Sequence, residues 1–106
     1  MLKTEVKTVE EFNQAIQGER VIMFFTANWC PDCFVIKPFM PQIEEAYSDF
    51  SFYLVNRDVL MDVCVEHDVF GIPSFIAFSH GKEVDRFVSK ERKTRAQIEA
   101  FLDSVR

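Results

Sequence analysis

Glycine and proline are scarce in this chain of 106 residues, which has three glycines and four prolines and no low-complexity or repeated segment. This composition excludes a collagen-like protein and a disordered linker. The chain also lacks an apolar run of the ~18 residues that a membrane span requires, and its first residues contain no apolar signal region. We therefore expect a soluble protein with one domain over residues 1–106, located in the cytoplasm.

Positive charge is also in short supply. Twelve Lys and Arg stand against seventeen Asp and Glu, which gives a net charge of -5 at pH 7. Because phosphates and anionic lipids repel an acidic protein, we expect neither nucleic acid nor a membrane as a partner. We also expect the chain to act as a monomer. Its three cysteines are too few, and odd in number, for the disulfide framework of a small secreted protein.

Hydrophobic residues make up 48% of the chain, and their spacing predicts alternating strands and helices. Strands are expected near residues 3–7, 21–27, 52–55, 75–78 and 84–88, and helices near 9–17, 31–47, 59–67 and after 94. The patterns that begin at Thr8 and Thr94 predict capping boxes, and Gly18 suits a left-handed position after the first helix. Pro38 and Pro41 predict a kink in the long second helix.

This order of elements predicts an α/β fold, a central mixed β-sheet flanked by helices on both faces. The continuous apolar run at 21–27 is typical of a central strand that is covered on both sides. Right-handed strand-helix-strand units make the middle of the sheet parallel, and the turn at His80-Gly81 adds an antiparallel hairpin. Reactive residues in such sheets follow the carboxyl ends of parallel strands, which is where Cys30 falls.

Cys30 and Cys33 stand three residues apart at the predicted start of a helix. One helical turn places their Cα atoms ~5 to 6 Å apart, within reach of a disulfide. The helix N-terminus stabilises a thiolate, so we expect Cys30 to be the nucleophile. Cys33, one turn further in, is expected to be more buried and to resolve a mixed disulfide. The pair favours thiol-disulfide redox chemistry over an inert buried pair or half of a metal site.

The segment WCPDC at residues 29–33 resembles the active-site motif of the thioredoxin family, and GIPS at 71–74 resembles its cis-proline loop. The resemblance extends over essentially the whole chain and implies a thioredoxin fold. It also implies a thiol-disulfide oxidoreductase that reduces protein or small-molecule disulfides. Such an enzyme needs no cofactor beyond its redox-active disulfide, and an external thiol reductase such as a thioredoxin reductase recycles it.

Several residues near the cysteines are expected to contact the substrate. The resemblance implies that Pro73 follows a cis peptide bond, packs against the cysteine pair and excludes metal. It also implies that the Ile72 backbone pairs with an extended substrate segment. Trp29, Pro31 and Phe70 are expected to complete this surface, because broad aromatic faces suit docking.

Asp32 is assigned a catalytic role. Its charge opposes the thiolate of Cys30, while its carboxylate can take the proton of Cys33 directly or through one water.

Pro31-Asp32 stands between the cysteines where thioredoxins usually have Gly-Pro, and the sequence departs from the thioredoxin pattern at three further places. Thioredoxins carry a buried aspartate six residues before the nucleophile, with a lysine partner one strand away, and Phe24 and Leu54 stand there. Losing both charges together leaves no unpaired buried charge, but it removes the usual proton acceptor for Cys33. Ser89 replaces the glycine that usually borders the binding groove, which changes the expected range of substrates.

Two other functions stay open. Cys30, Cys33, Cys64 and His67 have the side-chain types of a zinc site, although Cys64 by itself is typical of a small buried hydrophobe. A binding module could instead use the surface around Trp29, with redox activity incidental.

Positive charge gathers near the last helix. The cluster contains Arg86, Lys90, Arg92, Lys93 and Arg95. Such a run is typical of a solvated face, and it could also steer acidic partners toward the cysteines.

Overall fold

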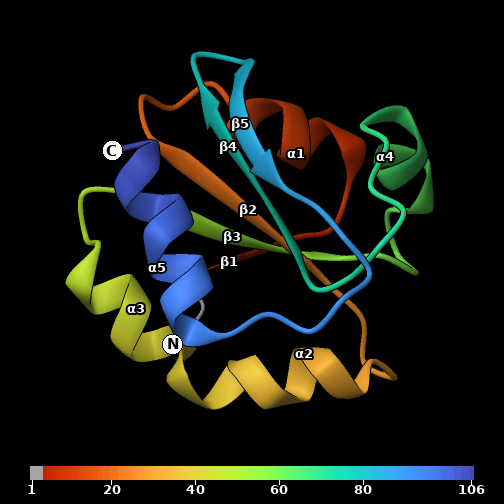
Figure 1. The fold of residues 1–106 in the computed structure, drawn as a ribbon. Helices are drawn as coiled ribbons and strands as arrows, with labels where there is room; N and C mark the ends of the chain where they lie inside the picture. The colour runs from red at the N-terminus through yellow and green to blue at the C-terminus, as the bar shows by residue number, and fades with distance from the viewer. Residues whose placement is uncertain (1–3) are drawn as a thin grey trace.

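The computed structural model describes residues 4–106, in which five strands alternate with helices (Figure 1). The elements are β1 (Thr4–Val6), α1 (Val9–Ala15), β2 (Val21–Thr26), α2 (Pro31–Ile36), the 3-10 helix η1 (Lys37–Phe39), α3 (Met40–Ala46), β3 (Ser51–Asn56), α4 (Met61–Glu66), β4 (Ser74–Ser79), β5 (Lys82–Phe87) and α5 (Arg95–Ser104). Within this part of the chain, no helix has the length and apolarity needed to cross a bilayer.

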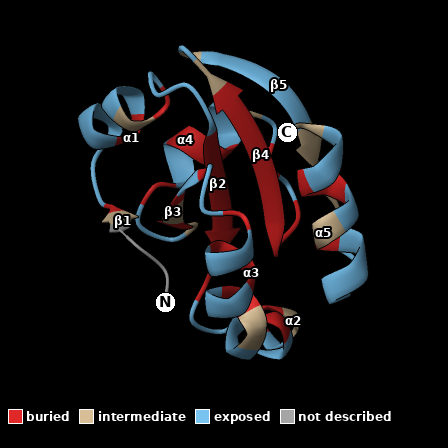
Figure 2. Cartoon of the chain, turned by 90° about the vertical axis from the view of Figure 1, so that its left-hand side faces the viewer, coloured by how far each residue is buried: buried red, intermediate tan, exposed pale blue. Residues whose placement is uncertain are grey.

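The strands form one mixed sheet in the order β1-β3-β2-β4-β5. β1 and β2 both run parallel to β3, whereas β4 is antiparallel to β2 and to β5. Figure 2 shows β2 and β4 buried along most of their length and β5 exposed at the edge. The predicted mixed sheet with a parallel centre and an antiparallel hairpin is confirmed.

Helices cover both faces of the sheet because alternate strand residues point to opposite sides. One core cluster joins β2, β3 and β4 to α1 and α4 and includes Val6, Phe12, Ile16, Met23, Phe25, Val63, Cys64, Ile76 and Phe78. The other joins the strands to α2, α3 and α5 and includes Ile22, Phe24, Ile36, Met40, Ile43, Phe52, Phe75, Ile98 and Leu102. All three cysteines belong to the first cluster.

The long helix expected over residues 31–47 is broken where its prolines fall. α2 ends at Ile36, η1 contains Pro38, and α3 begins at Met40 with Pro41 in its first turn. Neither proline has an N–H group to continue the hydrogen-bond ladder, so the chain tightens into a 3-10 turn between two α-helical parts.

The local signals at helix ends and turns were predicted unevenly. Thr94 forms a complete capping box, but at Thr8 the side chain of Glu11 binds the N–H of Lys7 instead of closing the box. The prediction of a left-handed conformation at Gly18 is wrong, because Gly18 has no positive φ angle. Positive φ angles occur instead at His80 (51°) and Gly81 (85°), which form the two-residue turn between β4 and β5.

Candidate active site

Cys30 lies between β2 and α2, at the carboxyl end of the parallel β2-β3 pair. It is the N-cap of α2, and its sulfur accepts a hydrogen bond of 3.2 Å from the backbone N–H of Cys33. The sulfur therefore occupies the place of the usual capping oxygen, where an anion is stabilised by unpaired N–H groups. This is the position that the sequence predicted for the nucleophile.

The turn at residues 71–74 packs against Cys30. The Cys30 sulfur lies 3.9 Å from the carbonyl oxygen of Ile72, and the peptide bond between Ile72 and Pro73 is cis. The hydroxyl of Ser74 donates a 2.6 Å hydrogen bond to the carbonyl of Gly71. The turn is thus held closed on itself beside the Cys30 sulfur.

Burial does not distinguish the two cysteines, contrary to the sequence-based expectation. Cys30 and Cys33 are each 4% exposed. They differ in what they face, because Cys30 lines an open groove, whereas Cys33 lines a cavity of about 30 Å³. The walls of that cavity also include Phe24, Thr26, Ala27, Asn28, Phe34, Lys37 and Leu54. A cavity of this size holds about one water molecule.

Burial of the Cys33 thiol raises its pKa. Burial is the main cause and brings the pKa of the thiol to about 11, although hydrogen bonds with Thr26 and Ala27 act in the opposite direction. Phe24 and Leu54 lie opposite each other in the β2-β3 register, as expected for the two positions that lack the family's charges. Cys33 is therefore held as a neutral thiol near neutral pH.

Asp32 has a partner that the sequence analysis did not predict. Its carboxylate accepts a 2.9 Å hydrogen bond from Nε of Arg92, which lies in the loop between β5 and α5. We call residues 88–94 the basic loop. In Figure 1 this loop is the blue segment that leads from β5 into α5.

The basic loop is tied together by Lys93, which is 2% exposed and so contradicts a fully solvated positive face. Its Nζ donates three hydrogen bonds of 3.0 Å, to the carbonyl and hydroxyl of Ser89 and to the carbonyl of Glu91. The ammonium also lies 5.1 Å from the ring centre of Phe87. Burial lowers the pKa of this ammonium, and the three acceptors offset the loss of water.

Gly71 brings the basic loop against the turn at 71–74. A Cβ atom at this glycine would lie 2.4 Å from both the backbone N of Lys90 and the carbonyl C of Ser89. The hydroxyl of Ser74 also lies 3.4 Å from the carbonyl oxygen of Ser89. The two segments that border Cys30 are therefore in direct backbone contact.

A groove of about 270 Å³ opens at Cys30, and we call it the Cys30 groove. Its lining comprises Trp29, Cys30, Pro31, Asp32, Arg57, Phe70, Gly71, Ile72 and Lys90. Every predicted substrate-contact residue except Pro73 belongs to this set. Trp29 and Phe70 are 57% and 71% exposed, so two large aromatic side chains of the groove lining stand in solvent. Exposed aromatic surface of this kind is typical of a docking site.

Arg57 in this lining was missed by the sequence analysis. Its guanidinium lies 5.7 Å from the ring centre of Trp29, whose indole N–H donates a 2.8 Å hydrogen bond to Asp58. Arg57 and Asp58 directly follow β3, the parallel neighbour of β2. That position is a signal that was available, since the carboxyl ends of parallel strands meet at one edge.

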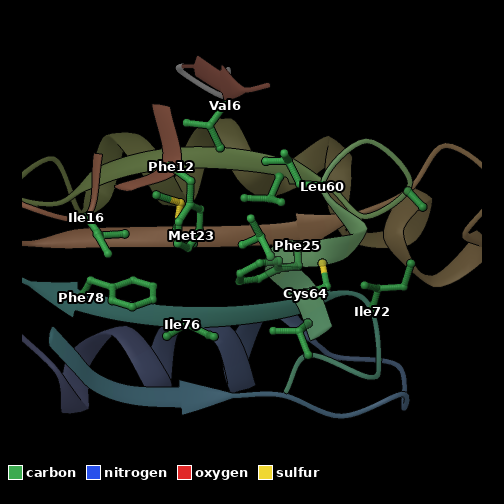
Figure 3. Packing of buried hydrophobic residues seen from close by; sticks show 14 of the residues in the cluster. Val6, Phe12, Ile16, Met23, Phe25, Leu60, Cys64, Ile72, Ile76 and Phe78 are labelled. Carbon is green, nitrogen blue, oxygen red and sulfur yellow. The ribbon is translucent and has the colours of Figure 1, made fainter. Parts of the chain in front are cut away.

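The four residues of the alternative zinc site do not form one site. Cys64 is 1% exposed among the apolar side chains of the first core cluster (Figure 3), and burial raises the pKa of its thiol. The His67 ring packs against aromatic rings, with centres 5.2 Å from Phe12 and 5.7 Å from Phe78. Residues 4–106 contain no group of three or more His, Cys, Asp or Glu side chains arranged to hold a metal ion.

Comparison with known proteins agrees with this geometry. A family model described as Thioredoxin matches residues 3–104. Thioredoxin-1 of Saccharomyces cerevisiae is 37% identical over 86 residues, covering 80% of this chain and 84% of the yeast protein. Thioredoxin of Equus caballus is 33% identical over 102 residues, covering 92% of this chain and 97% of the horse protein. A solved Plasmodium falciparum thioredoxin shares the fold, with a TM-score of 0.87, 24% identity and coverage of 98% of this chain and 100% of that one.

Proposed function

Because this chain belongs to the thioredoxin family and is a thiol-disulfide oxidoreductase, we propose that it acts mainly as a reductase of protein disulfides. One observation carries the proposed direction of attack. The Cys30 sulfur caps α2 and lines the open Cys30 groove, while Cys33 does not line that groove and borders a separate small cavity. A substrate disulfide in the groove reaches Cys30 first.

Reduction then takes two exchanges of sulfur. The Cys30 thiolate attacks one sulfur of the substrate disulfide, the substrate S–S bond breaks, and the departing sulfur takes up a proton. Cys33 next loses its proton and attacks the Cys30 sulfur, which releases the second substrate thiol and leaves a Cys30–Cys33 disulfide. The substrate has gained two electrons and two protons. A thiol reductase of the thioredoxin reductase type returns two electrons to the pair and is the proposed recycling partner.

The roles of the surrounding residues follow from their place beside Cys30. Trp29 and Phe70 offer the substrate apolar contact in the groove lining, and Pro31 completes the surface. The Ile72 backbone binds an extended substrate segment, which its position next to the Cys30 sulfur supports. Pro73 packs beside the cysteine pair and keeps metal ions away from it.

Asp32 is proposed to act on both exchanges. As a carboxylate inside the first turn of α2, it slows attack by Cys30 and accepts the proton that Cys33 must lose. Phe24 and Leu54 offer no carboxylate that could accept this proton in place of Asp32, and both of these residues line the cavity at Cys33.

We further propose that residues 1–106 act as one domain, as a monomer, without a cofactor other than the dithiol. Three cysteines are too few, and odd in number, for the disulfide framework of a small secreted protein, which supports a cytoplasmic location. The net charge of -5 supports proteins, not nucleic acid or anionic membranes, as partners.

Two cysteine variants test the order of attack. Cys30→Ser is expected to abolish reduction of a protein disulfide, whereas Cys33→Ser completes one attack and stalls as a mixed disulfide that intact-mass measurement detects. Cys64→Ser is the control and is expected to keep turnover, because Cys64 lies in the core. Turnover by Cys30→Ser would contradict the assignment. Binding without turnover in the unaltered protein would instead indicate a docking module.

A further inference from the structure

Two positively charged side chains of the Cys30 groove have no carboxylate partner. Arg57 and Lys90 line the groove, and neither takes part in any ion pair found within residues 4–106. By contrast, Arg86, Arg92 and Arg95 each bind an acidic side chain. In a chain with a net charge of -5, two cationic side chains without an ion-pair partner beside Cys30 are a local exception.

The acidic residues at the groove are already engaged. Asp32 is held by Arg92 at 2.9 Å, and Asp58 accepts the indole N–H of Trp29 at 2.8 Å. Neither lies within ion-pair distance of Arg57 or Lys90. The two cations are therefore available to a ligand carboxylate.

Arg57 is held in place by an aromatic ring. Its guanidinium lies 5.7 Å from the ring centre of Trp29, and its buried Nε has no hydrogen-bond partner in the described chain. A guanidinium that stacks on a ring keeps its charge and its outer N–H groups for a planar carboxylate. Arg57 is half-buried, so its side chain is already partly ordered and loses less conformational entropy when a substrate binds.

Lys90 approaches from the other side of the groove. It belongs to the basic loop after β5, whereas Arg57 follows β3, and β3 and β5 flank the central β2-β4 pair. The backbone contact at Gly71 fixes the loop that carries Lys90. The exposed lysine is thus a second, separate point of positive charge on the opposite wall.

We propose that the Cys30 groove selects protein segments that carry acidic side chains on both sides of the disulfide to be reduced. This inference rests on the proposed reductase function and names its substrate class. A polypeptide spans both walls and also offers apolar side chains to Trp29 and Phe70, whose exposed aromatic surface a small disulfide leaves uncovered. The exchange of electrons and protons is the one given above, and the charges act on encounter and orientation.

Matched disulfide peptides test the proposal. Three peptides with the same apolar residues carry Glu, Gln or Lys on each side of an oxidised cysteine pair, and each is mixed in excess with the reduced protein. Peptide loss is followed by acid quench and chromatography, and each rate is divided by the rate with dithiothreitol, which corrects for intrinsic reactivity. We expect the Glu peptide to react about threefold to tenfold faster than the Lys peptide, with the difference shrinking as salt is added.

Substitutions locate the effect. Arg57→Gln and Lys90→Gln should each reduce the Glu-to-Lys rate ratio, and the double variant should bring it close to one. Lys82→Gln removes the same charge at the start of β5, where Lys82 pairs with Ser79 at the end of β4 away from the turn at 71–74, and should leave the ratio and the Gln-peptide rate unchanged.

The possible outcomes distinguish failure of this proposal from failure of the proposed reductase function. A ratio that survives in the double variant, or that falls equally in Lys82→Gln, overturns the selection of acidic segments. The proposal is also overturned if the double variant reduces oxidised glutathione more slowly than the unaltered protein does but reduces the Glu peptide at the same rate. The groove would then take a small acidic disulfide and not a protein segment. Failure of the Gln peptide to react at all contradicts the reductase function itself.

Discussion

Asp32 places a carboxylate in the same helical turn as both cysteines, and Arg92 binds it from a segment 60 residues away in sequence. The guanidinium offsets part of the repulsion that Asp32 exerts on a thiolate at Cys30. An exposed ion pair is worth only about 0–1 kcal/mol, so the effect on Cys30 reactivity should be severalfold and not many orders of magnitude.

A double-mutant cycle measures this effect. Asp32→Asn should make Cys30 react faster with iodoacetamide near neutral pH, and Arg92→Gln should make it react about twofold to fivefold more slowly. In the Asp32→Asn background, Arg92→Gln should lose most of its effect, because the carboxylate it compensates is gone. The measurement is the alkylation rate of the reduced protein as a function of pH.

Arg95→Gln is the matched control, since Arg95 pairs with Glu99 on α5 and should not change the rate. The same Asp32→Asn protein should release a preformed Cys30 mixed disulfide more slowly, because Cys33 has lost its proton acceptor. If attack and release both accelerate, Asp32 only slows attack. The Cys33 proton must then leave through solvent.

At the scale of elements, the turn at 71–74 and the basic loop behave as one assembly. Gly71 allows their backbones to touch, and Lys93 holds the loop in the shape that makes the contact. The turn carries Ile72 to the Cys30 sulfur, and the loop carries Arg92 to Asp32. Any change that separates the two segments is therefore expected to alter both the contact of Ile72 with the Cys30 sulfur and the ion pair of Arg92 with the Asp32 carboxylate.

Gly71→Ala tests this contact. The new Cβ would lie 2.4 Å from backbone atoms that cannot rotate away, so the segments must move apart. We expect a loss of about 1–3 kcal/mol in the free energy of unfolding, together with slower disulfide reduction. Gly18→Ala is the comparison, since its Cβ would come within 3 Å of one side-chain atom only, Cγ2 of Val21 at 2.9 Å, and of no backbone atom. An equal cost at both glycines, measured by urea unfolding, would contradict the close backbone contact.

What could be predicted from sequence depended on how local each signal was. The cap at Thr94, the break at Pro38 and the position of Cys30 depend on neighbours within about four residues, which a pattern can reveal. Arg92 and Lys93 could not be placed in this way. Their partners and burial follow from how the basic loop packs on Gly71, a contact between distant segments. A run of charged residues predicts side chains exposed to solvent, and only the tertiary structure shows that Lys93 is buried.

The high pKa of Cys33 links the state of one thiol to the stability of the whole molecule. Burial raises that pKa from 9.0 to about 11, so between these values the unfolded chain has lost this proton while the folded chain keeps it. The free energy of unfolding is unaffected below pH 9 and falls as pH rises through this window. The full effect is about 2–3 kcal/mol, and Cys64 contributes in the same direction.

Urea unfolding of the phosphine-reduced protein measures this dependence. The unaltered protein should lose more stability between about pH 8 and about pH 11 than Cys33→Ser does. The difference between the two proteins removes contributions common to both, such as that of Cys64. Parallel pH profiles would show that Cys33 titrates normally in the folded state and would refute the burial argument.

Trp29 is the only tryptophan in the chain, and it immediately precedes Cys30. Its indole N–H is bound to Asp58, and the guanidinium of Arg57 lies 5.7 Å from its ring centre. All tryptophan fluorescence of the molecule is therefore emitted from one point, at the mouth where disulfides are exchanged. The unlabelled protein carries its own optical probe, and the arrival of a substrate or the closing of the dithiol can be watched in real time without a dye.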